Sequence, residues 1–153
     1  MAKVSHGPRP QLGHLLHADH DRLDGLLEVY RASSGSSSAE RRTLFDPFAT
    51  GLRAHIDFEE LHLFPDYHGG NPVRGTVLEL MLDEHRRIKD ALSRIEERLA
   101  TDPADTADLE EELVNVLWAH DAREEEAVYP WIDRSLEREE LDRLATLFER
   151  RAP

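Results

Sequence analysis

Two residue types that bind metals, His and Glu, recur in this sequence at one constant offset. Three pairs are each 65 residues apart: His20 and His85, His55 and His120, and Glu59 and Glu124. Each Glu follows a His by four residues, which on a helix leaves both side chains on one face, about 40° apart. Imidazole nitrogens and carboxylate oxygens are ligands of first-row transition metals. The pattern therefore predicts one metal site built from two halves of the chain.

The apolar residues around these positions predict that the site faces a protein core. His85 lies four residues after Met81 and three before Ile88, so it fills a gap in an apolar helical stripe. The other three His occupy equivalent positions in their own segments. Carboxylates such as Glu59 and Glu124 are costly to bury without a counter-charge, and no Lys or Arg shares their stripes at these levels. We therefore expect a metal to balance their charge.

Six ligands of this kind suit two metal ions better than one. If each Glu bridges both ions, each ion receives two His nitrogens and two carboxylate oxygens. An oxo or hydroxo bridge would then add a fifth ligand and leave one position open. Such nitrogen and oxygen ligation favours iron, with manganese and zinc as alternatives. The chain has no Cys, which argues against a structural zinc site.

Three further residues are candidates for additional ligands. His17 shares much of the helical face of His20. It could bind the metal directly, or it could donate a hydrogen bond to one of the ligands. His62 lies seven residues after His55, on the same helical face. It could be a further ligand, or its side chain could lie in water beside the helix end. Glu125 stands next to the Glu of the second repeat, but in a regular helix it does not face inward.

Acidic and aromatic residues beside the ligands repeat as well. Asp19 matches Glu84 and Glu60 matches Glu125. One reading is that these acids support the metal-binding His residues. Because acids on outward helix faces are common, we favour the alternative that these side chains are solvated. The pairs Phe64-Pro65 and Tyr129-Pro130 are expected to end helices, although the Tyr129 side chain is long enough to reach the site.

Helical periodicity places these residues on four long segments. It predicts an all-α protein with helices over about 11–31, from 38 to Pro65, from Pro72 to 99, and from Pro103 towards 131, followed by a short fifth helix over about 136–150. Ser37 with Glu40, Asn71-Pro72 and Asp102-Pro103 have the composition of helix starts. Short connections favour an up-down-up-down four-helix bundle. We expect a single domain over residues 1–153, with its core at about 12–134.

Composition excludes several classes of protein. The 32 acidic and 19 basic residues give a formal net charge of −13, which would repel nucleic acid and anionic membranes. No stretch approaches the roughly 20 apolar residues of a membrane span. The N-terminal residues "MAKVSHGPRPQLGH" lack the apolar core of a signal peptide, so we expect a cytoplasmic protein.

The ordered set of motifs resembles the hemerythrin-like, or HHE cation-binding, family. It comprises "DH" at 19–20, "HIDFEELHLFP" at 55–65, "EH" at 84–85 and "HDAREEEAVYP" at 120–130, and the likeness spans about residues 12–134. The resemblance implies a non-haem di-iron centre in a four-helix bundle, with reversible O2 binding, O2 or redox sensing, NO handling or iron-related roles.

The chain departs from the oxygen-carrying members of this family. They take a fifth His four residues before the one matched by His85, and here that position is Met81. They also use a carboxylate five residues after the last His, where this chain has Glu125 beside Glu124. The resemblance therefore points less to oxygen transport than to binding or sensing of O2 or another diatomic ligand.

Two other functions compete with ligand binding. One is a di-iron enzyme with oxidase-like or peroxidase- or catalase-like activity. Ferritin-like oxidases need two Glu-x-x-His motifs, and this chain has one, from Glu59 to His62. The other is a metal-free bundle whose acidic surface binds a basic protein, which leaves the inward-facing His and Glu unexplained. The sequence does not identify a protein partner.

Overall fold

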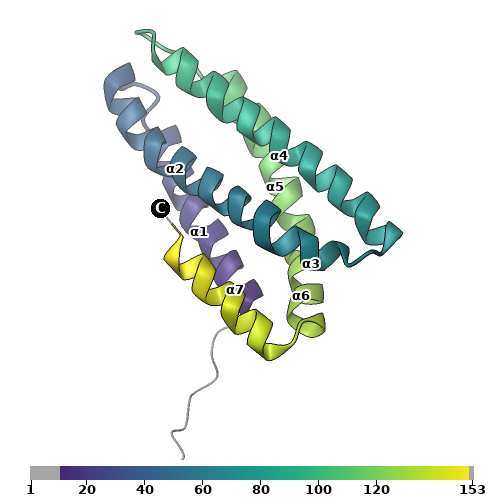
Figure 1. Ribbon diagram of the computed structural model, residues 1–153. Coiled ribbons are helices and arrows are strands. Elements are labelled where there is room, and N and C mark those ends of the chain that lie inside the picture. Colours follow the sequence, from purple (N-terminus) through teal and green to yellow (C-terminus); the bar gives the residue numbers. More distant parts are fainter. Residues whose placement is uncertain (1–10, 152–153) are drawn as a thin grey trace, which may run out of the picture.

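The computed structural model describes residues 11–151, and within this range it contains helices and no strands. Four long helices lie side by side: α1 (Leu12–Arg31), α2 (Ser38–Phe58), α4 (Pro72–Leu99) and α5 (Ala107–Arg123) (Figure 1). α1 packs on α2, α2 on α4, and α4 on α5. The four-helix bundle with a C-terminal helix, α7 (Arg138–Arg150), is confirmed. Residues 1–10, which hold most of the segment tested for a signal peptide, lie outside the described range.

Two of the three expected helix starts are confirmed. The Ser37 hydroxyl accepts a hydrogen bond from the Glu40 backbone N–H at the start of α2. The Asn71 side chain accepts from two backbone N–H groups at the start of α4, where Pro72 is the first helical residue. These contacts satisfy N–H groups that have no partner within the helix.

The helix start expected at Asp102-Pro103 is wrong, because α5 begins only at Ala107. The Asp102 carboxylate has a different role. It accepts hydrogen bonds from the Ser38 backbone N–H at 3.3 Å and from the Ser38 hydroxyl at 3.1 Å. The carboxylate therefore ties the α4–α5 connection to the first residue of α2 and is not free to cap its own helix.

The expectation that Pro65 and Pro130 end helices is also wrong. Each proline is preceded by a π-helical turn, η1 (Glu59–Leu63) or η2 (Glu124–Val128), and the chain continues into α3 (Phe64–His68) or α6 (Tyr129–Ser135). In a regular α-helix the proline ring would clash with the carbonyl four residues earlier. The π-turn contains one extra residue, which changes the position of that carbonyl relative to the proline ring. The helix therefore continues beyond the proline. Such turns occur frequently at functional sites.

The core consists of two apolar clusters with a polar layer between them. One cluster contains Leu23, Ile88 and Leu117, and the other contains Leu16 and Met81. Along α1 and α4, the buried His lies between a member of each cluster. The apolar side chains thus hold the four helices in register on both sides of the His and Glu level.

Helix α7 covers the side of the bundle where His55 lies. Its Phe148 ring meets the His55 ring edge-on, with centroids 5.8 Å apart, and packs similarly on Phe58 at 5.0 Å. Just after the helix, the Arg151 guanidinium lies 2.6 Å from the Asp19 carboxylate. Both contacts connect the C-terminal helix to residues of the polar layer.

Replacing Phe148 by Ala is expected to lower the free energy of unfolding by about 3–5 kcal/mol, the usual cost of truncating a buried Phe. Phe148 is 4% exposed, so its loss opens a cavity against His55 and Phe58. Thermal and urea unfolding would measure the change. The control is Leu61→Ala, at a position 69% exposed, which should change stability little. Equal effects of the two substitutions would contradict a buried packing role for Phe148.

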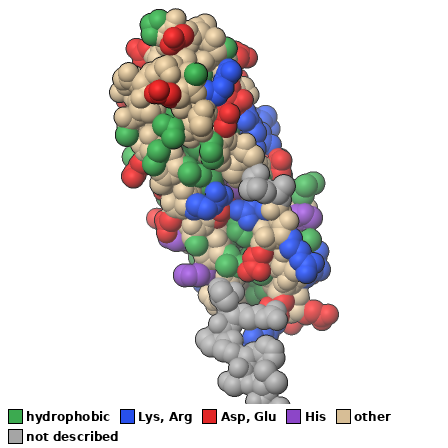
Figure 2. Space-filling model, turned by 90° about the vertical axis from the view of Figure 1, so that its left-hand side faces the viewer, with side chains coloured by type: hydrophobic (Ala, Val, Ile, Leu, Met, Phe, Trp, Pro, Cys, Tyr) green, Lys and Arg blue, Asp and Glu red, His purple; other side chains and the backbone are tan. Residues whose placement is uncertain are grey.

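The surface is mixed in character. Figure 2 shows one face of the molecule, on which acidic, basic and apolar side chains are interspersed. Within residues 11–151, no helix combines the length and apolar character required to cross a bilayer.

Candidate metal site

The structure brings the six repeated His and Glu residues together in two overlapping groups. One contains His20 and His55, the other contains His85 and His120, and both include Glu59 and Glu124. All six side chains are buried, with at most 3% of any residue exposed. Each group takes three residues from one half of the sequence and one Glu from the other half, so the repeat forms one site, not two.

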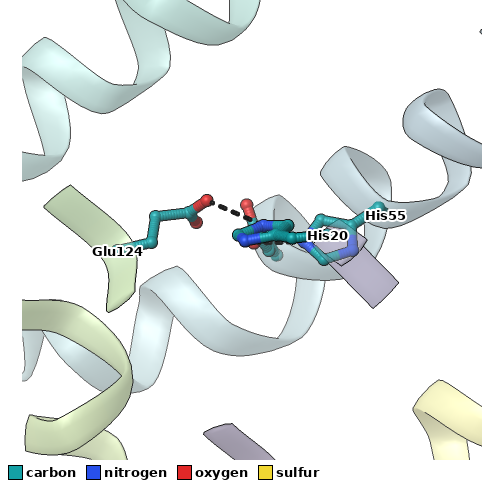
Figure 3. A group of neighbouring side chains, drawn as sticks. His20, His55 and Glu124 are labelled. Atoms are coloured by element: carbon teal, nitrogen blue, oxygen red, sulfur yellow. Dashed lines mark hydrogen bonds and ion pairs between the residues drawn. The ribbon is translucent and has the colours of Figure 1, made fainter. Parts of the chain in front are cut away.

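In the first group, the ligand atoms converge within hydrogen-bonding distance of one another. The Nε2 atoms of His20 and His55 are 3.2 Å apart, and His55 Nε2 lies 2.8 Å from Glu59 Oε1. Figure 3 shows His20 and His55 facing Glu124, whose Oε1 atom lies 3.5 Å from His20 Nε2.

The second group has the same arrangement. The Nε2 atoms of His85 and His120 are 2.9 Å apart, and Glu124 Oε1 lies 3.1 Å from His120 Nε2. Glu59 reaches this group through its other oxygen, Oε2, which is 3.3 Å from His85 Nε2. Because one oxygen of Glu59 faces each pair of His, this carboxylate can bridge two ions.

Some buried carboxylate oxygens of the site lie 3.1–3.5 Å from imidazole nitrogens without forming a hydrogen bond. Glu59 Oε2 and both carboxylate oxygens of Glu124 are inaccessible to solvent and accept no hydrogen bond. An unpaired carboxylate in a protein core costs several kcal/mol, so proteins pair such groups or bind them to metals. The donor set and its unsatisfied oxygens therefore fit a pair of divalent or trivalent cations.

The outer nitrogens of two His contact carboxylates that were expected to be solvated. His20 Nδ1 donates to Glu125 Oε1 and His55 Nδ1 donates to Asp19 Oδ2, both at 2.8 Å. The same arrangement occurs in the other half. His85 Nδ1 donates to Glu60 Oε1 at 2.9 Å.

The fourth contact is longer, since His120 Nδ1 lies 3.6 Å from Glu84 Oε1. The expectation of solvated acids is therefore wrong for Asp19 and Glu84, which are 7% and 2% exposed, and incomplete for the partly exposed Glu60 and Glu125. A residue that faces outward on its own helix can lie in the groove against a neighbouring helix and contact a His there. Such partners hold an imidazole with its other nitrogen aimed at the metal.

Most of these outer carboxylates also contact a cation. Asp19 pairs with Arg22 and Arg151, and Glu84 accepts two hydrogen bonds from Arg123. Lys89 lies 3.6 Å from Glu60. These cations orient the outer carboxylates.

Electrostatics in the site favour protonated imidazoles when no metal is bound. Burial alone lowers the pKa of a His, but the carboxylates of Glu124 and Asp121 raise the pKa of His20 to about 10. In the same way, Glu59 and Asp19 outweigh burial and raise the pKa of His55 to about 9. Burial raises the pKa of Glu59, but the imidazole of His55 more than offsets this and holds it well below its usual range. Protons thus balance the buried carboxylates, and a metal would replace them.

Metal-free protein is therefore expected to lose stability as the pH rises. The folded-state pKa of His20 and His55 lies above the unfolded value of 6.5, so their stabilising contribution is complete below about pH 6.5 and is lost as the pH rises through 9 and 10. Thermal unfolding of chelator-treated protein across this range would measure the loss. A variant with both His replaced by Asn should show a flatter profile. A wild-type profile that is flat or rises over this range would contradict the prediction.

The three candidates for additional ligands lie at the edge of the two groups or outside them. His17 is exposed, with its Nδ1 atom 3.1 Å from Glu125 Oε1. Glu125 contacts His17 and the outer nitrogen of His20. His62 is partly exposed and its ring lies 5.4 Å from the ring of Phe58, in a surface pocket that α7 helps to form.

Two further polar residues face the site: Tyr129, as its length allowed, and Asp121, which the sequence analysis did not single out. The Tyr129 hydroxyl donates to Glu59 Oε1 at 2.5 Å, and burial together with Glu124 raises the pKa of this hydroxyl well above its usual value. Asp121 Oδ1 lies 3.5 Å from His20 Nε2, and burial raises the pKa of Asp121 to about 7. The residues 65 positions earlier, Phe64 and Ile56, are apolar. A comparison of the repeats for polar residues opposite apolar ones would have identified Asp121 as well.

The comparison with known families agrees with this geometry. The model of the hemerythrin HHE cation binding domain matches residues 11–132. No curated protein and no solved structure is significantly similar to the chain. The matched segment covers the four-helix bundle and all six residues of the two buried groups, and it ends before α7. The chain belongs to the hemerythrin HHE cation-binding domain family.

Proposed function

We propose that the protein holds two iron ions between its four central helices and binds or senses O2, or another diatomic molecule such as NO, at an open coordination position. One observation carries the proposal: the two buried groups of His and Glu share Glu59 and Glu124. A shared pair of carboxylates would bridge two ions, and an oxo or hydroxo ion would complete the bridge.

The side chains have separate roles in this proposal. His20 and His55 would hold one ion, and His85 and His120 the other, each through its Nε2 atom. Counting the two shared carboxylates, each ion receives four protein ligand atoms. A six-coordinate ion therefore retains room for a bridging oxygen and for an incoming ligand. The iron pair, when bound, supplies the electrons that a diatomic ligand accepts.

The surroundings of the site support reversible binding more than continuous turnover. Leu16 and Met81 are fully buried next to the His level and belong to the same apolar cluster. Apolar walls exclude water and delay the arrival of protons, which irreversible reduction of O2 requires. Iron is favoured over other metals because the donors are imidazole and carboxylate, without thiolate.

Metal content measured by elemental analysis is the first test. Protein is reconstituted with Fe(II) without air, and O2 or NO uptake is then followed by the amount bound and by absorption spectra. Two irons per chain, with ligand uptake that reverses when the gas is removed, would support the proposal. Continuous consumption of O2 or H2O2 would favour the enzymatic alternative. Wild-type protein that binds no metal, with stability unchanged by a strong chelator, would overturn the proposal.

A further inference from the structure

The Tyr129 hydroxyl lies inside the first group of ligands, not beside it. Its oxygen is 2.5 Å from Glu59 Oε1 and 3.2 Å from the Nε2 atoms of both His20 and His55. Tyr129 is 3% exposed, so its hydroxyl contacts protein atoms and not bulk water. One oxygen thus approaches three atoms that would bind the same ion.

The distances from the Tyr129 oxygen to the two His nitrogens match the spacing between ligands of a single ion. Ligand atoms about 2.0–2.2 Å from a metal and at right angles to each other lie about 3 Å apart. The Nε2 atoms of His20 and His55 show this spacing at 3.2 Å, and the Tyr129 oxygen has the same distance to each of them. The oxygen therefore occupies the place of a neighbouring ligand around one ion.

Hydrogen bonds alone do not satisfy this group of atoms in the state that binds metal. Metal-binding His is neutral, and here the Nδ1 atoms donate to Glu125 and Asp19, which leaves a lone pair on each Nε2. The Tyr129 hydroxyl has one proton, which it gives to Glu59. Two imidazole lone pairs and the tyrosine oxygen then face one another, and a cation satisfies all of them at once.

Among residues 11–151, the other half of the site has no such oxygen. The residue that matches Tyr129 in the repeat is Phe64, whose ring stacks on the His85 ring with centroids 5.3 Å apart and an angle of 13° between the planes. A phenyl ring cannot ligate. The two metal positions therefore differ in one ligand, although their His and Glu residues are equivalent.

We propose that the Tyr129 oxygen is a further protein ligand of the ion held by His20 and His55. The inference rests on the proposed di-iron centre and specifies where its open position lies. Because Tyr129 would occupy a coordination place on one ion, the incoming diatomic ligand would bind at the other, which His85 and His120 would hold near Phe64. On coordination the tyrosine releases its proton to solvent, because metals bind the deprotonated form of such ligands.

Absorption and resonance Raman spectra of the ferric protein test the proposal. Wild type, Tyr129→Phe and Tyr67→Phe are loaded with Fe(II) without air, oxidised with ferricyanide and analysed for iron. Tyr67 is the matched control, since it is also buried but packs on Trp131 away from the two groups. Phenolate-to-iron charge transfer and tyrosine ring vibrations are expected in wild type and in Tyr67→Phe, and their loss is expected in Tyr129→Phe.

The outcomes separate this inference from the proposed function. Two irons in wild type without a phenolate band, or a band that persists in Tyr129→Phe, would overturn the Tyr129 ligand and leave the di-iron site intact. No iron in wild type would overturn both. If Tyr129→Phe loses its iron, Tyr129→His decides, because imidazole can ligate and phenyl cannot. Iron recovered without the phenolate band supports the proposal, and failure to recover it counts against it.

Discussion

Replacing Glu59 and Glu124 together by Ala is expected to reduce the iron content of reconstituted protein from two ions per chain to near zero. These carboxylates are the two residues that belong to both groups of ligands, so each ion loses two ligand atoms at once. The remaining four His carry no negative charge to balance the ions. Elemental analysis after anaerobic loading with Fe(II) and removal of excess metal measures the change.

The same variant separates metal binding from folding. A ligand that binds only the folded state stabilises it by RT ln(1 + [L]/Kd), which is about 4 kcal/mol at a thousandfold excess over Kd. A strong chelator should therefore lower the melting temperature of the wild-type protein, and it should leave that of the double variant unchanged. Glu79→Ala with Glu126→Ala is the control, because both residues are exposed and neither belongs to the groups. Full iron content in the Glu59 and Glu124 variant would rule out the bridging roles.

Replacing Asp19 by Asn is expected to weaken metal binding by about 10–100-fold, the range typical for residues that orient a metal-binding His. Asn preserves the size of the side chain and can still accept the hydrogen bond from His55 Nδ1, but it removes the negative charge. The change also deprives Arg151 and Arg22 of their ionic partner. Competition with a chelator of known affinity measures the loss.

The structure predicts a graded result across the outer carboxylates. Glu84→Gln should have a smaller effect than Asp19→Asn, because the contact of Glu84 with His120 is 3.6 Å long, against 2.8 Å for Asp19 with His55. Asp46→Asn, on an exposed position of α2, serves as the control and should leave the affinity unchanged. Equal affinities in Asp19→Asn and Asp46→Asn would show that the outer contact to His55 does not support metal binding.

These outer contacts explain how the C-terminal helix is connected to the site. α7 lies beyond the segment matched by the family, yet Arg151 reaches Asp19 and Phe148 reaches His55. The periodicity of residues 136–150 correctly predicted a helix there, since Leu144 and Phe148 form its buried face. Its position over His55 did not follow from that pattern, because periodicity identifies the apolar face of a helix but not the surface on which that face packs.

Much of the site could be predicted from the sequence because helices convert spacing into direction. A period of 3.6 residues places a His in an apolar stripe and a Glu four residues later on the same inner face. The 65-residue repeat then indicated that two such hairpins face each other. The bundle, the inward orientation of the six His and Glu residues and their meeting at one level followed from local geometry and from the cost of burying unpaired carboxylates.

Only the tertiary structure decided which residues from different helices meet. The contacts of Asp19, Glu84, Glu60 and Glu125 with the outer nitrogens of the His cross from one helix to another, so spacing within a helix could not reveal them. The π-turns change the register before Pro65 and Pro130, which regular periodicity does not anticipate. The sequence determined what faces inward, because that depends on local periodicity. The packing of the helices determined which atoms lie 3 Å apart, and so made Tyr129 part of the site and Phe64 part of its wall.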